Sequence, residues 1–197
     1  MTNPRIQVFK RFVEDLATLS KCTDKHVAAI IIDKEATQVF SIGVNGGPKG
    51  GLDCLCTLGG KYTCAHAEAN ALAKCKQDCR GATMICTMSP CVTCATLIVN
   101  AGITQVYFLK RYKDNTGIEI LEQAGVTVVD CEAEDKERAE LAAIPDYIQE
   151  LFDKSTLRIP KGDARMLEEI KYYCNKYHKQ GRFVESPSTL EVVCIIN

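Results

Sequence analysis

The sequence lacks several features that mark whole classes of protein. It has no run of about 18 apolar residues, so it predicts no membrane-spanning helix. Its amino terminus, MTNPRIQVFKRF, has no apolar segment of the kind found in secretory signal peptides. Lysine and arginine form no block of about five or six residues, and the formal net charge is only −1. A binding surface for nucleic acid or for a membrane is therefore not predicted.

The composition is otherwise that of an ordinary globular protein, with cysteine as the exception. The chain of 197 residues is long enough for one domain with a core and an appendage. It holds 12 cysteines, which is unusual in the absence of an export signal. In a reducing compartment they are expected to bind metal, take part in catalysis or fill the core rather than form disulfides. The isolated cysteines are predicted to be small buried hydrophobic residues: Cys75, Cys86, Cys131, Cys174 and Cys194.

Hydrophobic periodicity predicts an alternation of helices and strands up to about residue 131. The predicted helices are 4–20, 66–76, 91–101 and 117–124, and the predicted strands are 27–32, 38–44, 82–88, 105–109 and 126–129. The first two strands should form an antiparallel hairpin, and the strands that helices separate should run parallel. The glycine-rich segment 45–51 is predicted to be a loop. We therefore expect a three-layer α/β/α domain over 1–131 with a mixed five-stranded sheet, in which the fourth and fifth strands are parallel.

The remaining segment, 132–197, is expected to be a C-terminal helical extension that packs on the same domain. Its charged part, 132–180, is predicted to be mostly helical, with breaks at Pro145 and at Ile159–Gly162. The apolar end, 190–196, is predicted to be either a strand or a docking tail.

Two short motifs lie at the starts of predicted helices. Cys91 and Cys94 in SPCVTC are three residues apart, so both thiols face the same side of a helix. The partial positive charge of a helix amino terminus favours the thiolate that binds metal. In TCAHAEANAL, His66 and Glu68 are about 200° apart around a helix axis, so they can converge only beyond the end of the helix. If both helices begin at the carboxyl-terminal edge of the sheet, their first residues meet there.

His66, Cys91 and Cys94 would then provide one nitrogen and two sulfur ligands, which suits tetrahedral zinc. A structural zinc normally has four protein ligands, so three leave a position for water, whose pKa zinc lowers to about 7. Glu68 would be the catalytic general acid/base rather than a ligand. A CxxC motif alone is also compatible with a redox pair, and a single histidine at a helix start with a cap or a packing residue. The joint pattern favours a catalytic zinc site.

Together the two motifs resemble the H-x-E…P-C-x-x-C signature of the zinc-dependent deaminases, through His66–Glu68 and Pro90–Cys94. The resemblance implies hydrolysis at C4 of a cytosine or at C6 of an adenine. The core also resembles the cytidine deaminase fold. Parallel fourth and fifth strands are similar to those of the deoxycytidylate, tRNA-adenosine and polynucleotide cytosine deaminases.

Other segments resemble the deoxycytidylate (dCMP) deaminases in particular, over about residues 5–130. They are SKCTDKHVAAIIID (20–33), SIGVNGGPKGGLDC (41–54), TMSPCVTCATLIVNAGI (87–103) and KRYKD (110–114). The resemblance implies hydrolysis of dCMP to dUMP and ammonia, which supplies dUMP for dTMP synthesis. It also implies a cytoplasmic location, in the host cytosol if the protein is viral. Val44 departs from the family, which usually has tyrosine there, so contacts of that ring do not carry over.

The same resemblance implies positions for the substrate. Asn45 would hydrogen-bond the sugar, although an asparagine before glycine is also a common turn residue. The N–H of Ala67 and the carbonyl of Ser89 would contact the edge of the base. Tyr112 would stack on the base, unless it is an ordinary partly buried aromatic residue. The candidates for binding the 5′-phosphate are Lys110, Arg111 and Lys113.

Regulation and assembly are implied in the same way. Deoxycytidylate deaminases are similar to one another in being homohexamers that dCTP activates and dTTP inhibits, with Mg²⁺ accompanying the triphosphate. The glycine loop would bind this effector, unless it is a plain flexible loop; its effector residues would be Asn45, Gly46, Gly47 and Lys49. Some viral members hold a second, structural zinc, for which the ligands here would be Cys22, Cys54, Cys56 and Cys64.

Two other functions stay open at this point. One is a deaminase that acts on cytosine or adenine in polynucleotide or tRNA, against which the lack of a basic surface argues. The other is a non-catalytic regulatory protein that zinc stabilises. The presence of Glu68 argues against it, because a purely structural site has no use for this carboxylate.

Overall fold

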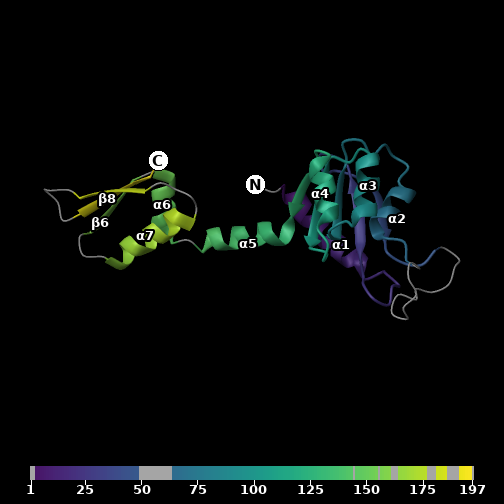
Figure 1. The fold of residues 1–197 in the computed structure, drawn as a ribbon, viewed down its shortest axis with the longest axis horizontal. Coiled ribbons are helices and arrows are strands. Elements are labelled where there is room, and N and C mark those ends of the chain that lie inside the picture. The colour runs from purple at the N-terminus through teal and green to yellow at the C-terminus, as the bar shows by residue number, and fades with distance from the viewer. Residues whose placement is uncertain are drawn as a thin grey trace. The chain divides into compact units, whose positions relative to one another are not determined.

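The computed structural model describes residues 3–48, 64–143, 145–154, 156–160, 164–176, 181–185 and 191–196. The chain divides into two compact units, 1–135 and 136–197, and each is described by itself (Figure 1). The boundary falls within helix α5 (Cys131–Ala142). The packing of the second unit on the first stays a prediction. In the described part of the chain, no helix has the length and apolar character needed to span a membrane.

A mixed five-stranded sheet forms the centre of the first unit, as the sequence predicts. Its strands are β1 (Ala28–Ile32), β2 (Val39–Val44), β3 (Thr83–Met88), β4 (Gln105–Lys110) and β5 (Thr127–Asp130), and its helices are α1 (Pro4–Ala17), α2 (Ala67–Lys74), α3 (Val92–Asn100) and α4 (Thr116–Gln123). The strand order is β2-β1-β3-β4-β5. Strand β1 is antiparallel to β2 and to β3, and β3, β4 and β5 are parallel to one another. The predicted parallel fourth and fifth strands are thus confirmed.

The sheet topology gathers several chain segments at one edge. Because β1 runs opposite to both of its neighbours, the carboxyl ends of β2, β3 and β4 lie at the same edge as the amino end of β1. In register, Val44 is opposite Ala28, and Met88 is opposite Lys110. The segments that leave these strands therefore start side by side, which is the arrangement that open α/β sheets use for ligand sites.

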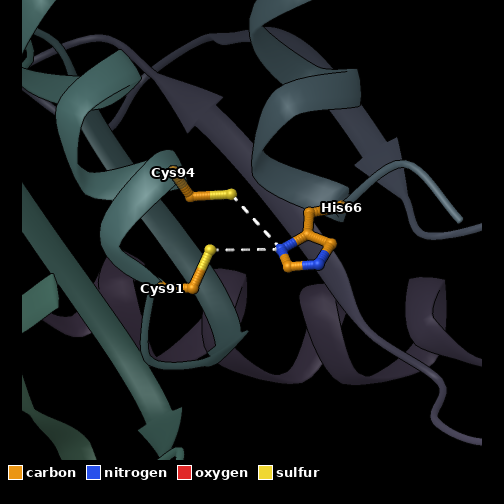
Figure 2. Close-up of side chains that lie close together, drawn as sticks. All are labelled: His66, Cys91 and Cys94. Atoms are coloured by element: carbon orange, nitrogen blue, oxygen red, sulfur yellow. Dashed lines mark hydrogen bonds between the residues drawn. The ribbon is translucent and has the colours of Figure 1, made fainter. Parts of the chain in front are cut away.

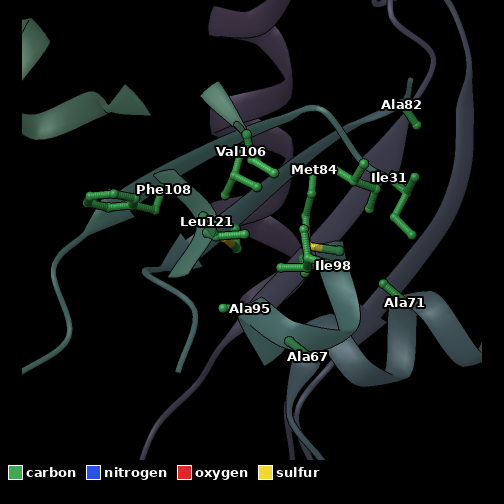
Figure 3. Close-up of a cluster of buried hydrophobic side chains, with 14 of the residues drawn as sticks. Ile31, Ala67, Ala71, Ala82, Met84, Ala95, Ile98, Val106, Phe108 and Leu121 are labelled. Carbon is green, nitrogen blue, oxygen red and sulfur yellow. The ribbon is translucent and has the colours of Figure 1, made fainter. Parts of the chain in front are cut away.

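Alternating residues of the strands face two separate apolar layers. On one face, Ile30 and Ile32 pack with Val13 of α1 and its buried neighbours. On the other face, Ile31 packs with residues of α2, α3 and α4, which Figure 3 shows. The labelled members of this layer include Ala67, Ala71, Met84, Ala95, Ile98, Val106, Phe108 and Leu121. The expected three-layer architecture follows from this division.

Two glycines allow helices to approach the sheet and the site closely. A Cβ atom on Gly43 of β2 would overlap the backbone of Ala67 and Ala71 in α2. A Cβ atom on Gly117 in α4 would overlap the backbone at Pro90 and Cys91. Neither glycine has a positive φ, so close approach rather than backbone conformation requires them. The first contact involves the start of α2, which carries one of the two motifs, and the second involves the turn before α3, which carries the other.

The second unit contains strands as well as helices. Its helices are the end of α5, α6 (Asp146–Lys154) and α7 (Ala164–Lys176), and its strands are β6 (Thr156–Pro160), β7 (Gly181–Glu185) and β8 (Glu191–Ile196). They form an antiparallel sheet in the order β6-β8-β7. Helices α5, α6 and α7 lie in the segment 132–180 that the sequence predicts to be mostly helical, which also contains strand β6, and 190–196 contains a strand, one of its two predicted alternatives. The sequence predicts neither β6 nor β7. Leu157 and Ile159 of β6 alternate with polar residues, but this strand lies within the segment predicted to be mostly helical, and β7 has no marked alternation.

The isolated cysteines only partly follow the predicted burial. Cys86, Cys131 and Cys174 are buried. Cys75 is half-buried, so its prediction is wrong: helix α2 ends at Lys74, and the Cys75 sulfur lies near the surface, 3.3 Å from the sulfur of Cys79. The side chain of Cys194 lies outside the described residues.

Candidate active site

Two helix amino termini at the shared sheet edge carry the predicted motifs. His66 is the N-cap of α2, and Cys91 is the N-cap of α3. Both residues have an extended backbone, and neither side chain forms a capping hydrogen bond with its own helix. Side chains at this position usually accept a bond from the first turn. Here they point instead toward a common point between the two helices, as Figure 2 shows.

His66, Cys91 and Cys94 come together as the sequence predicts. The Nδ1 atom of His66 lies 3.4 Å from Sγ of Cys91 and 3.5 Å from Sγ of Cys94 (Figure 2). All three ligand atoms lie within 4.8 Å of one another. Zinc bonds of about 2.1 Å to nitrogen and 2.3 Å to sulfur at a tetrahedral angle would separate these atoms by about 3.6 Å. The donor set and its spacing therefore fit a zinc ion.

Glu68 lies in the first turn of α2, and its side chain belongs to the site without belonging to the ligand cluster. The residue is 4% exposed. Burial is the main influence on its carboxyl and raises its pKa, against the smaller lowering effects of its own backbone N–H, His66 and Cys94. Burial likewise raises the pKa of the Cys94 thiol, and the charges of Glu68 and Cys91 raise it further. A metal that binds the Cys94 sulfur must therefore displace a proton.

A cavity of about 180 Å³ opens beside these groups. It is lined by Cys22, Asp24, Lys25, Val27, Asn45, Cys64, His66, Ala67, Glu68, Met88, Ser89, Cys91 and Tyr112. Four predicted substrate-binding residues, Asn45, Ala67, Ser89 and Tyr112, are thus brought to one place. They come from the ends of β2, β3 and β4 and from the start of α2, which explains why they are far apart in the sequence but close in the fold.

The side-chain amide of Asn45 already forms most of its possible hydrogen bonds within the protein. Its Oδ1 accepts hydrogen bonds from Ser20 Oγ at 2.6 Å and from the N–H of Val27 at 2.9 Å. Its Nδ2 donates to the carbonyl of Lys25 at 2.7 Å. Asn45 therefore fastens the segment before β1 to the end of β2, and one amide hydrogen is left for a ligand.

The predicted phosphate ligands do not line this cavity. Arg111 forms an ion pair of 2.6 Å with Asp130, and its guanidinium lies 5.7 Å from the ring centroid of Phe108. Lys110 lines a second, neighbouring cavity, and Lys113 lines neither. Lys25 and Asp24 line the active-site cavity instead. Sequence reasoning missed them because they belong to neither metal motif, and the pairing of β1 with β3 that brings them to the site is known only from the fold.

The structure describes only some of the residues predicted to bind the effector and the second zinc. Gly46 pairs with Ala65 through two backbone hydrogen bonds of 3.2 and 2.9 Å, and Gly47 follows it in a bend. Cys22 and Cys64 line the same cavity as His66. Lys49, Cys54 and Cys56 lie outside the described residues.

Three ligands that leave room for water, with a buried carboxylate beside them, suit hydrolysis rather than a closed structural site. The arrangement is therefore that of a hydrolytic zinc site rather than of a structural one. The family model described as "cytidine and deoxycytidylate deaminase zinc-binding region" matches residues 4–110. The chain belongs to this family, as the H-x-E…P-C-x-x-C motifs predict.

Relatives and solved structures agree with this assignment. The chain is 31% identical to the deoxycytidylate deaminase of Saccharomyces cerevisiae over 61% of its own length and 42% of the yeast protein. It is 33% identical to ComE operon protein 2 of Bacillus subtilis, over 70% of this chain and 79% of that protein. The crystal structure of dCMP deaminase from the cyanophage S-TIM5, in complex with dCMP and dUMP, matches with a TM-score of 0.61 and 30% identity, covering 66% of this chain and 98% of that one. The chain thus spans less than half of the yeast relative but nearly all of the phage structure.

We predict that replacing one sulfur ligand weakens zinc binding while the fold is kept. Cys94→Ser should lower the zinc affinity by at least about a hundredfold, because even changes behind the ligands cost about ten- to a hundredfold. A competition titration with a coloured chelator measures this affinity, and circular dichroism checks the fold. Cys75→Ser, outside the cluster, is the control. Wild-type affinity in Cys94→Ser would show that this sulfur does not bind the metal.

Proposed function

We propose that this protein hydrolyses dCMP to dUMP and ammonia. The observation that carries the proposal is the His66–Cys91–Cys94 cluster beside buried Glu68, in a chain whose likeness to a phage dCMP deaminase covers 98% of that enzyme. The reaction consumes one water molecule and replaces the amino group at C4 of the base by a carbonyl oxygen. The product dUMP would serve the synthesis of dTMP.

The chain's own residues account for the proton transfers. A zinc ion held by His66, Cys91 and Cys94 would act as a Lewis acid that makes water a better nucleophile at neutral pH. The carboxylate of Glu68 accepts the proton that the attacking water loses and delivers it to N3 of the cytosine ring. Glu68 then passes a second proton from the added hydroxyl to the amino group, which leaves C4 as ammonia. A carboxyl group that both accepts and donates protons must stay off the metal, in keeping with its exclusion from the ligand cluster.

The walls of the cavity suit a pyrimidine nucleotide. The N–H of Ala67 and the carbonyl of Ser89 would pair with the edge of the base, and Tyr112 would stack on its face. The position of Tyr112 is supported by a 2.8 Å hydrogen bond from its N–H to Ser89 Oγ. Asn45, with one amide hydrogen left, would contact the sugar.

We also propose that the enzyme is a homohexamer that dCTP activates and dTTP inhibits, with Mg²⁺ bound to the triphosphate. The support is the resemblance of the glycine loop to that of the deoxycytidylate deaminases. Because the Gly46 N–H already bonds Ala65, contacts from this loop to phosphate would come from Gly47 and Lys49. A cytoplasmic location accords with the nine cysteines whose side chains the structure describes, none of which forms a disulfide bond.

A second, structural zinc is a further proposal. Cys22 and Cys64 line one cavity although 42 positions separate them (64 − 22), and Cys54 and Cys56 lie between them in the sequence. Four thiolates would make a closed tetrahedral site. We expect metal analysis of the purified protein to find two zinc ions per chain, one of them lost in Cys22→Ser. A single zinc per chain with the His66 site full would exclude the second site.

The substrate class is best tested with a set of cytosine compounds. We expect deamination of dCMP in preference to CMP, deoxycytidine and single-stranded DNA, with dCTP raising and dTTP lowering the rate at subsaturating dCMP. Ammonia release measured for each compound, with and without each triphosphate, provides the comparison. A preference for single-stranded DNA would point to a polynucleotide deaminase instead.

The role of Glu68 is tested separately. Glu68→Gln should lower kcat by at least about a thousandfold, because it removes the only proposed proton carrier, with zinc content and melting temperature close to wild type. Rates and bound zinc are measured on the same preparation. Loss of zinc together with activity would mean that Glu68 holds the metal site together rather than carrying protons.

A further inference from the structure

Lys25 is the only lysine or arginine among the described residues that line the active-site cavity. Asp24 and Glu68 line the same cavity, so without Lys25 the fixed charges near the base would repel an anion. A nucleotide substrate nevertheless carries a phosphate into this region. The position of Lys25 therefore matters for which substrates the cavity accepts.

The backbone of Lys25 is held in place by the fold. Its carbonyl accepts the 2.7 Å hydrogen bond from Asn45 Nδ2, and Asn45 in turn accepts from Ser20 and Val27. The side chain of Lys25 therefore extends from an anchored backbone position between Ser20 and the start of β1. Its side chain is exposed, so the ammonium group can meet a ligand without first losing a buried partner.

The side chain of Lys25 reaches over the residue proposed to stack on the base. Its Nζ atom lies 5.0 Å from the ring centroid of Tyr112, within cation–π distance. A base stacked on Tyr112 would therefore have this ammonium nearby. One cation at that point can contact a group attached to the sugar but cannot read the base edge, which faces Ala67 and Ser89.

A second cavity continues from this point with a mainly basic lining. It has a volume of about 420 Å³ and shares Lys25 and Met88 with the active-site cavity. Its other charged or titratable residues are His26, Lys110 and Glu14. Three basic residues against one acidic residue suit an anion that leaves the first cavity past Lys25.

We propose that Lys25 binds the 5′-phosphate of the substrate and so selects the nucleotide over the nucleoside. Arg111, the strongest rival, is held by Asp130 and lines neither cavity. Lys110 lines only the second cavity and would add a weaker, longer-range attraction. The inference rests on the proposed dCMP deaminase function and names the residue that gives this function its specificity.

The test compares dCMP with deoxycytidine in three variants. Lys25→Met removes the charge but keeps a long apolar side chain, Lys25→Arg restores the charge, and Lys21→Met is the control, an exposed lysine that lines neither cavity. Lys25→Met should lower kcat/KM for dCMP by about ten- to a hundredfold, the usual loss for a hydrogen bond to a charged group, and leave deoxycytidine unaffected. Lys25→Arg should recover most of the loss, and Lys21→Met should match wild type.

A binding measurement makes the result independent of turnover. Calorimetry with dUMP and with deoxyuridine should show a Kd for dUMP that rises about ten- to a hundredfold in Lys25→Met, with no change for deoxyuridine. If Lys25→Met weakens both ligands equally, Lys25 acts by positioning Tyr112 and the inference is wrong. It is also wrong if neither ligand is affected. Failure of the wild type to deaminate dCMP would instead overturn the proposed function, and the dUMP comparison would still decide whether Lys25 recognises phosphate.

Discussion

The structure depends on one constraint: helices α2 and α3 must begin close enough for their first residues to share a metal ion. His66 and Cys91 occupy the N-cap positions, and Cys94 follows one turn later. Gly43 lets α2 press against β2, and Gly117 lets α4 press against the turn before α3. A side chain larger than hydrogen at either glycine would overlap the neighbouring backbone, so the start of α2 or the turn before α3 would have to shift.

The topology of the sheet then decides what surrounds the metal. With β1 running against β2 and β3, the chain segments after three strands and before a fourth all meet at one edge. The pocket wall therefore combines Asn45, Ser89 and Tyr112 with Lys25, although 87 positions separate the most distant pair (112 − 25). Glu68 reaches the same edge because it lies in the first turn of α2, where burial raises the pKa of its carboxyl group.

Local sequence patterns predicted most of the first unit correctly. Each predicted element of this unit corresponds to an observed helix or strand, with ends that differ by a few residues at most; the helix predicted over 4–20, for example, ends at Ala17. The zinc ligands were predictable because their spacing fits helix starts and because a known signature combines them. Strands β6 and β7 escaped prediction because β6 lies within a segment with a mainly helical pattern and β7 has no alternation, and both pair with β8 in the fold.

The sequence by itself determined the elements of the first unit, the ligand set and the family, because periodicity, capping and motif spacing are properties of neighbouring residues. Only the tertiary structure decided which basic residue faces the cavity. The sequence alone does not distinguish the positions of four basic residues, Lys25, Lys110, Arg111 and Lys113. In the structure, Arg111 is paired with Asp130 of the adjacent strand β5, while a hydrogen bond from Asn45 holds Lys25 at the pocket. Charge pairing and strand adjacency join residues distant in the sequence, and these long-range contacts exist only once the sheet has formed.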